Sequence, residues 1–201
     1  MSEENLFSHL RRLIDEGIDP VSREQEIHEQ YGRHVSVLVL DSVGFSRISE
    51  ERGIVHYLTR LMQMRDVVQP ILNHHEALSS TFEADNAFAV FADANRAVCA
   101  AHAIHVAIDT SGLMLTDTEA FQCCIGVGSG RLLYSQTLEG YFGEEMNLAS
   151  KLGEDVAEGG ETLITAATYQ ILSDDLRGHY VSEQQSIAGI DLTYYRNSGI
   201  L

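Results

Sequence analysis

The sequence predicts an α+β domain in which one mixed or antiparallel sheet is covered by packed helices. Three observations carry this prediction: an apolar strand-like run near residue 35, two amphipathic helical stretches in the first half, and strand-like runs that follow each of them. No internal repeat or low-complexity linker interrupts residues 35–201. We therefore expect one domain over 35–201, preceded by an N-terminal helical segment over 1–34.

The composition of the chain limits the kinds of partner that it is expected to bind. The chain has 201 residues with 44% hydrophobic and 21% charged residues, as in a globular protein with one sizeable core. It has no apolar run of ~18 residues and its first residues are polar, so we expect a cytoplasmic protein that does not bind membranes. The net charge of −17 argues against nucleic acid as a partner. A polyanionic ligand would need a local source of positive charge, and a metal site is the simplest one.

The first elements are two helices and a buried strand. Apolar residues at helical spacing predict a first helix that is ended by Gly17 and Pro20, and a second short helix over 23–31. Five of the six residues in 35–40 are apolar, which predicts a core strand. Asp41 stands where this run stops, and Ser-Val-Gly-Phe-Ser follows it. A carboxylate at the mouth of a core strand is the first indication of a functional site.

A long helix, a hairpin and a second long helix come next. Apolar residues over 49–75 share one helical stripe, with a kink or break expected at Pro70. The strand-like runs 78–83 and 87–91 enclose the sequence EADN, which predicts a hairpin with an acidic tip. Small and apolar residues between 97 and 108 repeat at helical spacing.

The second half alternates short elements. Residues 121–127 predict a strand, and GVGSGRLLY predicts a turn and a return strand rather than a phosphate-binding loop, because its glycines do not make GxGxxG. The remaining predicted elements are short helices over 144–153 and 166–173 and strands over 161–165, 179–184 and 191–196. This order is a ferredoxin-like α+β arrangement, with the helices on one face of the sheet.

The predicted fold suggests why Asp41 is charged. The first strand of such a sheet lies beside the hairpin, so Asp41 and Asp85 are expected to meet although they are distant in sequence. Together with the backbone carbonyl of Ser42, they offer hard oxygen ligands for Mg²⁺ or Mn²⁺. Two ions there could deprotonate a hydroxyl group and stabilise a leaving phosphate. If each aspartate is considered alone, Asp41 could instead cap a turn, and Asp85 could be a solvent-exposed residue of a hairpin.

Three stretches resemble the motifs of the class III nucleotide cyclases, and the similarity spans residues 35–196. The stretch LVLDSVGFSRISEERG resembles their first metal motif. TFEADNAFAVF resembles the second, with Ala84 where glycine is usual, and YFGEEMNLASKL resembles the third. The resemblance implies that Asp41 and Asp85 bind two Mn²⁺ or Mg²⁺ ions with the carbonyl of Ser42.

The same resemblance implies the remaining site residues. Phe45 and Ser46 would shape the triphosphate and sugar site, and Asn147 would orient the ribose. Lys151 stands where the family usually has an arginine that stabilises charge in the transition state. The family site forms between two subunits, so a homodimer is implied. The implied reaction is attack of the ribose 3′-oxygen on the α-phosphate, which gives a 3′,5′-cyclic nucleotide and pyrophosphate.

Several positions depart from the family pattern. Thr81 and Gly140 occupy the two base-reading positions, and neither purine-reading pair of residues is present. A site rejects a wrong base strongly only by pairing its own buried polar groups. Tyr57 is the candidate for filling the space of a purine, and a half-buried helix tyrosine is the alternative. Lys151 lacks the fork of an arginine, and Ala188 stands where many relatives have a phosphate-binding lysine.

Either the chain is a decayed dimeric module or its base pocket has been rebuilt. The presence of Asp41, Asp85 and Asn147 favours a rebuilt pocket. If the chain had lost its activity, these residues would be as free to change as the base-reading residues. LVLDSVGFSR, LMQMRDVV and EADNAFAVF are most similar to the bacterial pyrimidine cyclases of Pycsar antiphage signalling. That resemblance implies UTP or CTP as substrate, a cyclic UMP or CMP product, and a separate effector protein that senses it. The alternatives are an adenylate or guanylate cyclase with an atypical base pocket, and a catalytically inactive dimerisation or sensing module.

Five other residues carry less specific signals. Arg47 and Arg131 are either phosphate contacts or solvated surface arginines. Cys99, Cys123 and Cys124 show no metal-ligand spacing and are expected to be reduced core cysteines. Because Cys123 and Cys124 are adjacent in a strand, their side chains should point to opposite faces of the sheet.

Overall fold

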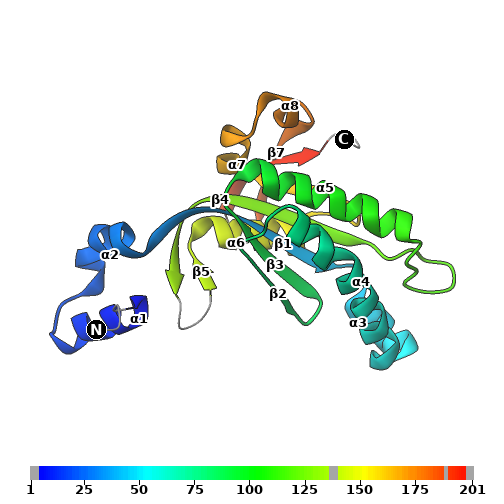
Figure 1. Ribbon diagram of the computed structural model, residues 1–201, viewed down its shortest axis with the longest axis horizontal. Coiled ribbons are helices and arrows are strands. Elements are labelled where there is room, and N and C mark those ends of the chain that lie inside the picture. Colours follow the sequence, from blue (N-terminus) through cyan, green and yellow to red (C-terminus); the bar gives the residue numbers. More distant parts are fainter. Residues whose placement is uncertain (1–4, 136–139, 188–189, 198–201) are drawn as a thin grey trace.

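The computed structural model describes residues 5–135, 140–187 and 190–197. The strands in these ranges are β1 (Gly32–Ser42), β2 (Ser79–Glu83), β3 (Asn86–Phe91), β4 (Cys123–Ser135), β5 (Gly140–Phe142), β6 (Thr162–Thr165), β7 (Tyr180–Ile187) and β8 (Ile190–Asn197). They form one sheet in the order β2-β3-β1-β4-β6-β8-β7, and β5 pairs with β4 (Figure 1). β4 and β6 are parallel and the other pairs are antiparallel. The predicted α+β fold with a single mixed sheet is confirmed.

Helices surround this sheet. They are α1 (Leu6–Asp15), the 3₁₀ turn η1 (Pro20–Arg23), α2 (Glu24–Tyr31), α3 (Phe45–Arg52), α4 (Ile54–His74), α5 (Ala94–Ser111), α6 (Glu144–Lys151), the π-helical turn η2 (Leu152–Val156), α7 (Ala166–Ile171) and α8 (Asp174–Arg177). Within the described ranges, none of them is both long enough and apolar enough to cross a membrane. Figure 1 places α1 and α2 beside β5 at one end of the molecule, and α3 and α4 at the other end.

The main core lies between the sheet and the helices α4 and α5. Leu38 and Leu40 of β1 are buried in one cluster with Met64 of α4 and Ile104 of α5. Large aliphatic side chains at period 2 in the strand and near 3.6 in the helices produce this contact. The amphipathic stripes of the sequence therefore identify this face correctly.

Helix α6 packs on the other face of the sheet. Val35, Val37 and Val39 alternate with the leucines of β1 and form a second cluster with Ala149 of α6. The prediction that all helices lie on one face was therefore wrong. The reason is that α6 is short and its contact with the sheet runs through glycines, which leave no hydrophobic stripe in the sequence.

The glycines of GVGSG explain this contact. A Cβ atom on Gly126 would overlap the carbonyl oxygen of Ala149, and one on Gly128 would overlap that of Glu145. The predicted turn and return strand is wrong, because β4 continues as one strand through these residues. Alternating glycines here allow a close approach of helix and strand backbones.

The long helix also differs from its prediction. Gly53, with a φ of 86°, separates α3 from α4, so residues 49–75 do not form one helix. Pro70 lies inside α4, which continues to His74, so the break expected there does not occur. Pro70 is in the last two turns, where only one backbone hydrogen bond is lost to its missing N–H group.

The N-terminal segment packs against the start of the sheet. Leu6, Leu13 and Ile27 form a small cluster with Leu133 of β4 against them. Arg131 of β4 donates to the carbonyl of His28 at 2.7 Å. The predicted boundary between residues 34 and 35 falls inside β1, which begins at Gly32.

Candidate active site

Asp41 and Ser42 are the last two residues of β1, and their side chains point to different faces. Asp41 has the same parity as Val35, Val37 and Val39, so it lies on the α6 face. In the register of the sheet it pairs with Asn86, the first residue of β3. The predicted carboxylate is thus at the C-terminal end of the central strand β1, directly beside the β2–β3 hairpin.

Asp85 follows a turn residue with unusual backbone geometry. Ala84 has a φ of 50°, in the left-handed region that favours glycine. Arg65 of α4 donates to the carbonyl of Ala84 at 2.8 Å, and its guanidinium lies 5.3 Å from the ring centroid of Phe82. Arg65 therefore fixes the turn that presents Asp85.

The structure brings the two predicted metal carboxylates together. Burial, together with the negative charges of Asp85 and Glu154, raises the pKa of Asp41 to about 6, against the opposing effect of the backbone N–H of Ser42. A carboxyl group responds in this way to burial near like charges. Glu154, in η2, was not predicted as part of this cluster.

Tyr57 lies beneath the end of β1 rather than in open space. Its hydroxyl is 2.5 Å from Oγ of Ser42, and its ring centroid is 5.1 Å from that of Phe45. The side chain is completely buried, and burial raises its pKa to about 12. Within this chain, Tyr57 is a core residue that supports Ser42, and its ring is not exposed to line a base pocket.

The donor set fits a pair of hard divalent cations. Asp41 and Asp85 supply carboxylate oxygens beside the C-terminal end of β1, and the Ser42 carbonyl supplies a third oxygen of the predicted set. Among the described residues, no ion pair joins either aspartate to a lysine or arginine, so no cationic side chain offsets their mutual repulsion. No group of three or more His, Cys, Asp or Glu side chains in these ranges could hold a metal alone. The remaining ligands would come from water or substrate phosphates.

Asn147 and Lys151 lie four residues apart on α6, so they share one side of that helix. Asn147 is exposed and Lys151 is half-buried. In the described part of this chain neither makes a hydrogen bond or ion pair with Asp41 or Asp85. The structure of one chain therefore does not unite the third motif with the metal carboxylates.

Three of the predicted substrate residues, Thr81, Phe45 and Ser46, are exposed. Thr81 of β2 pairs with Phe88 of β3, and Phe88 pairs with Val39 of β1. Val39 is two residues before Asp41 in the same strand, so Thr81 lies on the face of the sheet that carries Asp41. Phe45 and Ser46 are exposed at the start of α3.

Gly140 pairs with Ser135 at the far end of β4 from Asp41, so one chain does not place it beside Thr81 through the strand register. Ala188 lies outside the described residues.

The two arginines have other partners. Arg47 donates to Glu119 at 2.6 Å and also pairs with Glu51, while Arg131 holds α2 as described above. All three cysteines are free; Cys123 and Cys124 are buried, and Cys99 is half-buried. Cys123 belongs to the α4–α5 core, whereas Cys124 pairs with Asp41, so the opposite orientations are as predicted.

Glu145 anchors α6 in a way that sequence reasoning missed. Its Oε2 accepts from the backbone N–H of Ser129 at 3.1 Å and from the hydroxyl of Thr165 at 2.5 Å. Ser129 and Thr168 extend the network to Ser36 of β1. Burial raises the pKa of Glu145. The sequence holds no local signal for this network, because its members come from β1, β4, α6 and the β6–α7 junction.

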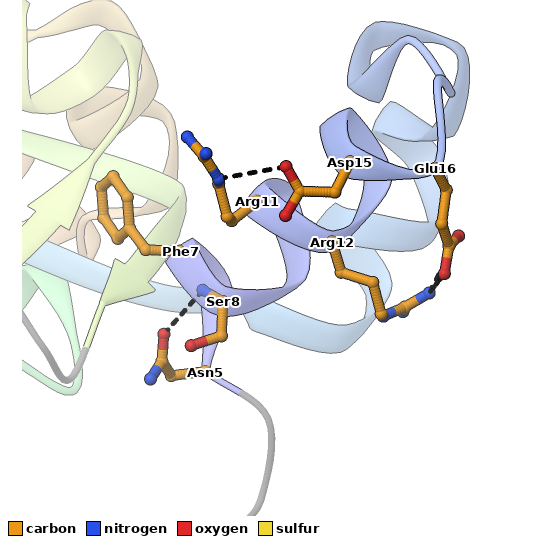
Figure 2. A pocket seen from close by; sticks show the side chains of 7 residues that line it. All are labelled: Asn5, Phe7, Ser8, Arg11, Arg12, Asp15 and Glu16. Atoms are coloured by element: carbon orange, nitrogen blue, oxygen red, sulfur yellow. Dashed lines mark hydrogen bonds and ion pairs between the residues drawn. The ribbon is translucent and has the colours of Figure 1, made fainter.

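Figure 2 shows a pocket on the exposed side of α1, far from these residues in the sequence. Its volume is about 670 Å³. Arg11 pairs with Asp15, and Arg12 pairs with Glu16, while Asn5 caps the helix through the N–H of Ser8. Because these groups satisfy one another one turn apart, the pocket shows ordinary helix-surface ion pairs and no convergent binding groups.

The sequence of the chain is similar to that of a curated protein named as a cyclase. No family model matches the chain. A curated protein of Rhizobium meliloti (strain 1021), named Putative adenylate cyclase 3, is 23% identical over 168 residues. The match covers 84% of this chain and 27% of that protein, so the chain spans about a quarter of this relative's length.

Solved cyclase structures share the fold. The Adenylate/Guanylate Cyclase/Hydrolase from Silicibacter pomeroyi superposes with a TM-score of 0.72 at 21% identity, over 84% of this chain and 98% of that one. The guanylate cyclase domain of RhGC from Catenaria anguillulae, in complex with GTP, gives 0.65 at 19% identity, over 84% and 97%. A guanylyl cyclase domain of the RhoGC fusion protein from Blastocladiella emersonii, described as a non-canonical dimer, gives 0.67 at 19% identity, over 83% and 96%. At these identities the likeness establishes the class III cyclase fold.

Proposed function

We propose that this chain is a nucleotide cyclase of the class III type, and that it cyclises a pyrimidine nucleoside triphosphate. The observation that supports the proposal is that Asp41 pairs with Asn86, the neighbour of Asp85, and that the charge of Asp85 helps to raise the pKa of Asp41. The names of the relatives, which include adenylate and guanylate cyclases, support the reaction class.

The proposed cofactor is a pair of Mn²⁺ or Mg²⁺ ions held by Asp41, Asp85 and the carbonyl of Ser42. Such ions, when bound, activate the attacking 3′-hydroxyl and neutralise charge on the phosphates. The protein's own contribution is to hold both carboxylates ready before binding. Arg65 fixes the turn that carries Asp85, and Tyr57 fixes the side chain of Ser42. Phe45 and Ser46, at the start of α3, would border the triphosphate.

The active unit is proposed to be a homodimer. The support is that Asn147 and Lys151 have no described contact with the aspartates of their own chain. Among the solved relatives, one guanylyl cyclase domain is described as a non-canonical dimer and others are described as monomeric. In the proposed homodimer Asn147 orients the ribose of a substrate held by the partner's aspartates. Lys151 supplies positive charge near the phosphate where the bond breaks. Because lysine lacks a bidentate fork, it stabilises this charge as a point charge.

The substrate is proposed to be UTP or CTP, and the product cyclic UMP or cyclic CMP. Thr81 and Gly140 cannot form the hydrogen bonds with which a Lys and Asp pair selects adenine. The product would act as a second messenger of antiphage defence, sensed by a separate effector protein. The second candidate is a purine cyclase, which the name of the Rhizobium meliloti relative favours.

The test is incubation of the protein with Mn²⁺ and each of four nucleoside triphosphates. Cyclic UMP or cyclic CMP as the main product supports the proposal. Cyclic AMP or cyclic GMP as the main product favours the second candidate. No cyclic product from any nucleotide, at a protein concentration where a dimer is demonstrated, supports the inactive module.

Matched variants test the metal assignment. Asp85→Asn should abolish turnover, by ~10³-fold or more, because one of the two carboxylates that would hold the ions is lost. It should not lower stability in the absence of metal, because it relieves repulsion with Asp41. Asp66→Asn, which removes an exposed carboxylate of α4, should retain activity. Unfolding of Asp85→Asn would show instead that Asp85 is structural.

A further inference from the structure

A cavity of about 490 Å³ lies on the α5 face of the sheet. It is bordered by α5, the first residues of β4 and β6, and the end of β8. Its volume is in the range of small-molecule sites. Asp41 points to the opposite face, so this cavity is separate from the proposed catalytic site.

The walls of the cavity combine apolar and neutral aromatic groups. Val106 of α5 and Phe121, just before β4, supply apolar surface. His102 and His105 are one turn apart on α5, and both border the cavity. His102 is bonded to Tyr180 at 2.9 Å, and His105 to Thr162 at 3.0 Å.

These two histidines carry no charge near neutral pH. Burial, together with the neighbouring His105 and His179, lowers the pKa of His102 to about 4. Burial likewise lowers the pKa of His105 to about 4. Their rings therefore offer flat neutral surface and would not repel a cation.

The charges at the cavity are negative. Asp109 and Glu161 border it, and its described lining contains no lysine or arginine. Arg196 reaches Glu161 from outside the lining, and its guanidinium is shared with Glu183. Because Arg196 neutralises Glu161, Asp109 is the carboxylate that has no cationic partner among the described lining residues, and its charge disfavours an anion such as a nucleotide or phosphate.

Gln122 adds a polar group at the rim. Its side chain is exposed and borders the cavity, and its backbone carbonyl accepts from the N–H of Val43 at 3.0 Å. Cys123, also in the lining, pairs with Ser42 in the sheet. The cavity therefore lies directly behind the strand end that carries Asp41, on the other side of the sheet.

We propose that this cavity binds a small aromatic amine or amidine. The ring would lie against Val106 and Phe121, and the N–H groups would donate to Asp109 and to the side-chain oxygen of Gln122. The site is independent of the proposed cyclase reaction, and its occupancy can be measured without activity.

Three probes of the same shape but different charge distinguish this proposal from non-specific binding. Benzamidine is a cation, benzamide is neutral and benzoate is an anion, and all three carry the same ring. Backbone amide NMR shifts in α5 and early β4 would report binding at equal millimolar concentrations. We expect benzamidine to bind more tightly than benzamide, and benzoate not to bind. Equal binding of benzoate, or no binding of benzamidine, overturns the proposal.

Two variants locate the probe. Val106→Trp should fill the cavity and remove binding, because Val106 is 50% exposed at its rim and the helix can accept a larger side chain there. Val181→Trp is the matched control, since Val181 on β7 is 55% exposed and is outside the lining. Asp109→Asn should weaken benzamidine about tenfold and leave benzamide unchanged. Retained benzamidine affinity in both Val106→Trp and Asp109→Asn places the probe elsewhere and refutes the site.

Discussion

The two faces of the sheet are packed by different physical means. On the α4–α5 face, Leu38 and Leu40 meet large side chains such as Met64 and Ile104. On the α6 face, Gly126 and Gly128 bring the backbones of strand and helix together. A contact between side chains can adjust by repacking, whereas a backbone contact cannot. The α6 face therefore holds Asn147 and Lys151 in a fixed place relative to Asp41, and the other face supplies most of the buried apolar surface.

The largest expected effect comes from adding one methyl group on the α6 face. Gly126→Ala should destabilise the protein by about 3 kcal/mol or more, because its Cβ atom would overlap the carbonyl of Ala149 and α6 would have to move. Urea unfolding measures this change in the free energy of unfolding.

Gly130→Ala is the matched control on the same strand. Its Cβ atom would meet the Cγ atom of Glu145 at 2.9 Å, a side-chain atom that can shift by a few tenths of an ångström without moving the backbone of α6. A loss of about 1 kcal/mol is expected. Equal losses for Gly126→Ala and Gly130→Ala would show that the close backbone approach does not decide stability on this face.

The two faces should respond oppositely to acid. On the α5 side, the pKa of both His102 and His105 is lowered to about 4, so the unfolded state binds more protons between pH 4 and the ordinary value of about 6.5. Their contribution to stability is therefore present above pH 6.5 and is lost as the pH falls towards 4. On the α6 side the pKa of Glu145 is raised, so protonation of this group in acid favours the folded state.

This contrast predicts a measurable pH dependence. When the pH falls from 7.5 to 5, the two histidines should together lower the free energy of unfolding by a few kcal/mol, at ~1.4 kcal/mol per pKa unit for each group. In His102→Gln, the loss on acidification should be smaller by about half. Urea unfolding at both pH values checks this difference, and an unchanged pH dependence in His102→Gln would contradict a buried neutral histidine.

The hydrogen-bond network beneath α6 gives a smaller effect. Glu145→Ala should cost about 2 kcal/mol, because it leaves the N–H of Ser129 and the hydroxyl of Thr165 without their acceptor. Glu145→Gln keeps an acceptor oxygen of similar shape and should cost less than half as much. Equal losses in thermal unfolding would mean that the charge of Glu145, and not its acceptor geometry, holds α6.

The contrast between the faces also explains what the sequence could predict. The α4–α5 face follows from apolar residues at helical and strand spacing, and the neighbouring strands placed Asp41 near Asp85. The glycines of β4 are compatible both with a turn and with a close backbone contact, and their partner α6 comes later in the chain. The charge of Glu154, in the π-helical turn η2, helps to raise the pKa of Asp41. No local pattern in the sequence predicts this turn.

The smallest expected change in stability comes from a substitution at the tip of the β2–β3 hairpin. Ala84 holds a left-handed φ of 50° immediately before Asp85, so Ala84→Gly removes backbone strain while adding freedom to the unfolded chain. We expect a net stabilisation of about 0.5 kcal/mol, since the left-handed conformation costs a non-glycine residue ~1 kcal/mol. Ala92→Gly is the matched control: Ala92 is exposed and is not among the residues with positive φ, so only the entropic loss applies and stability should fall. Opposite signs in thermal unfolding would locate the strain at the turn that presents Asp85, whereas a loss in both variants would contradict it.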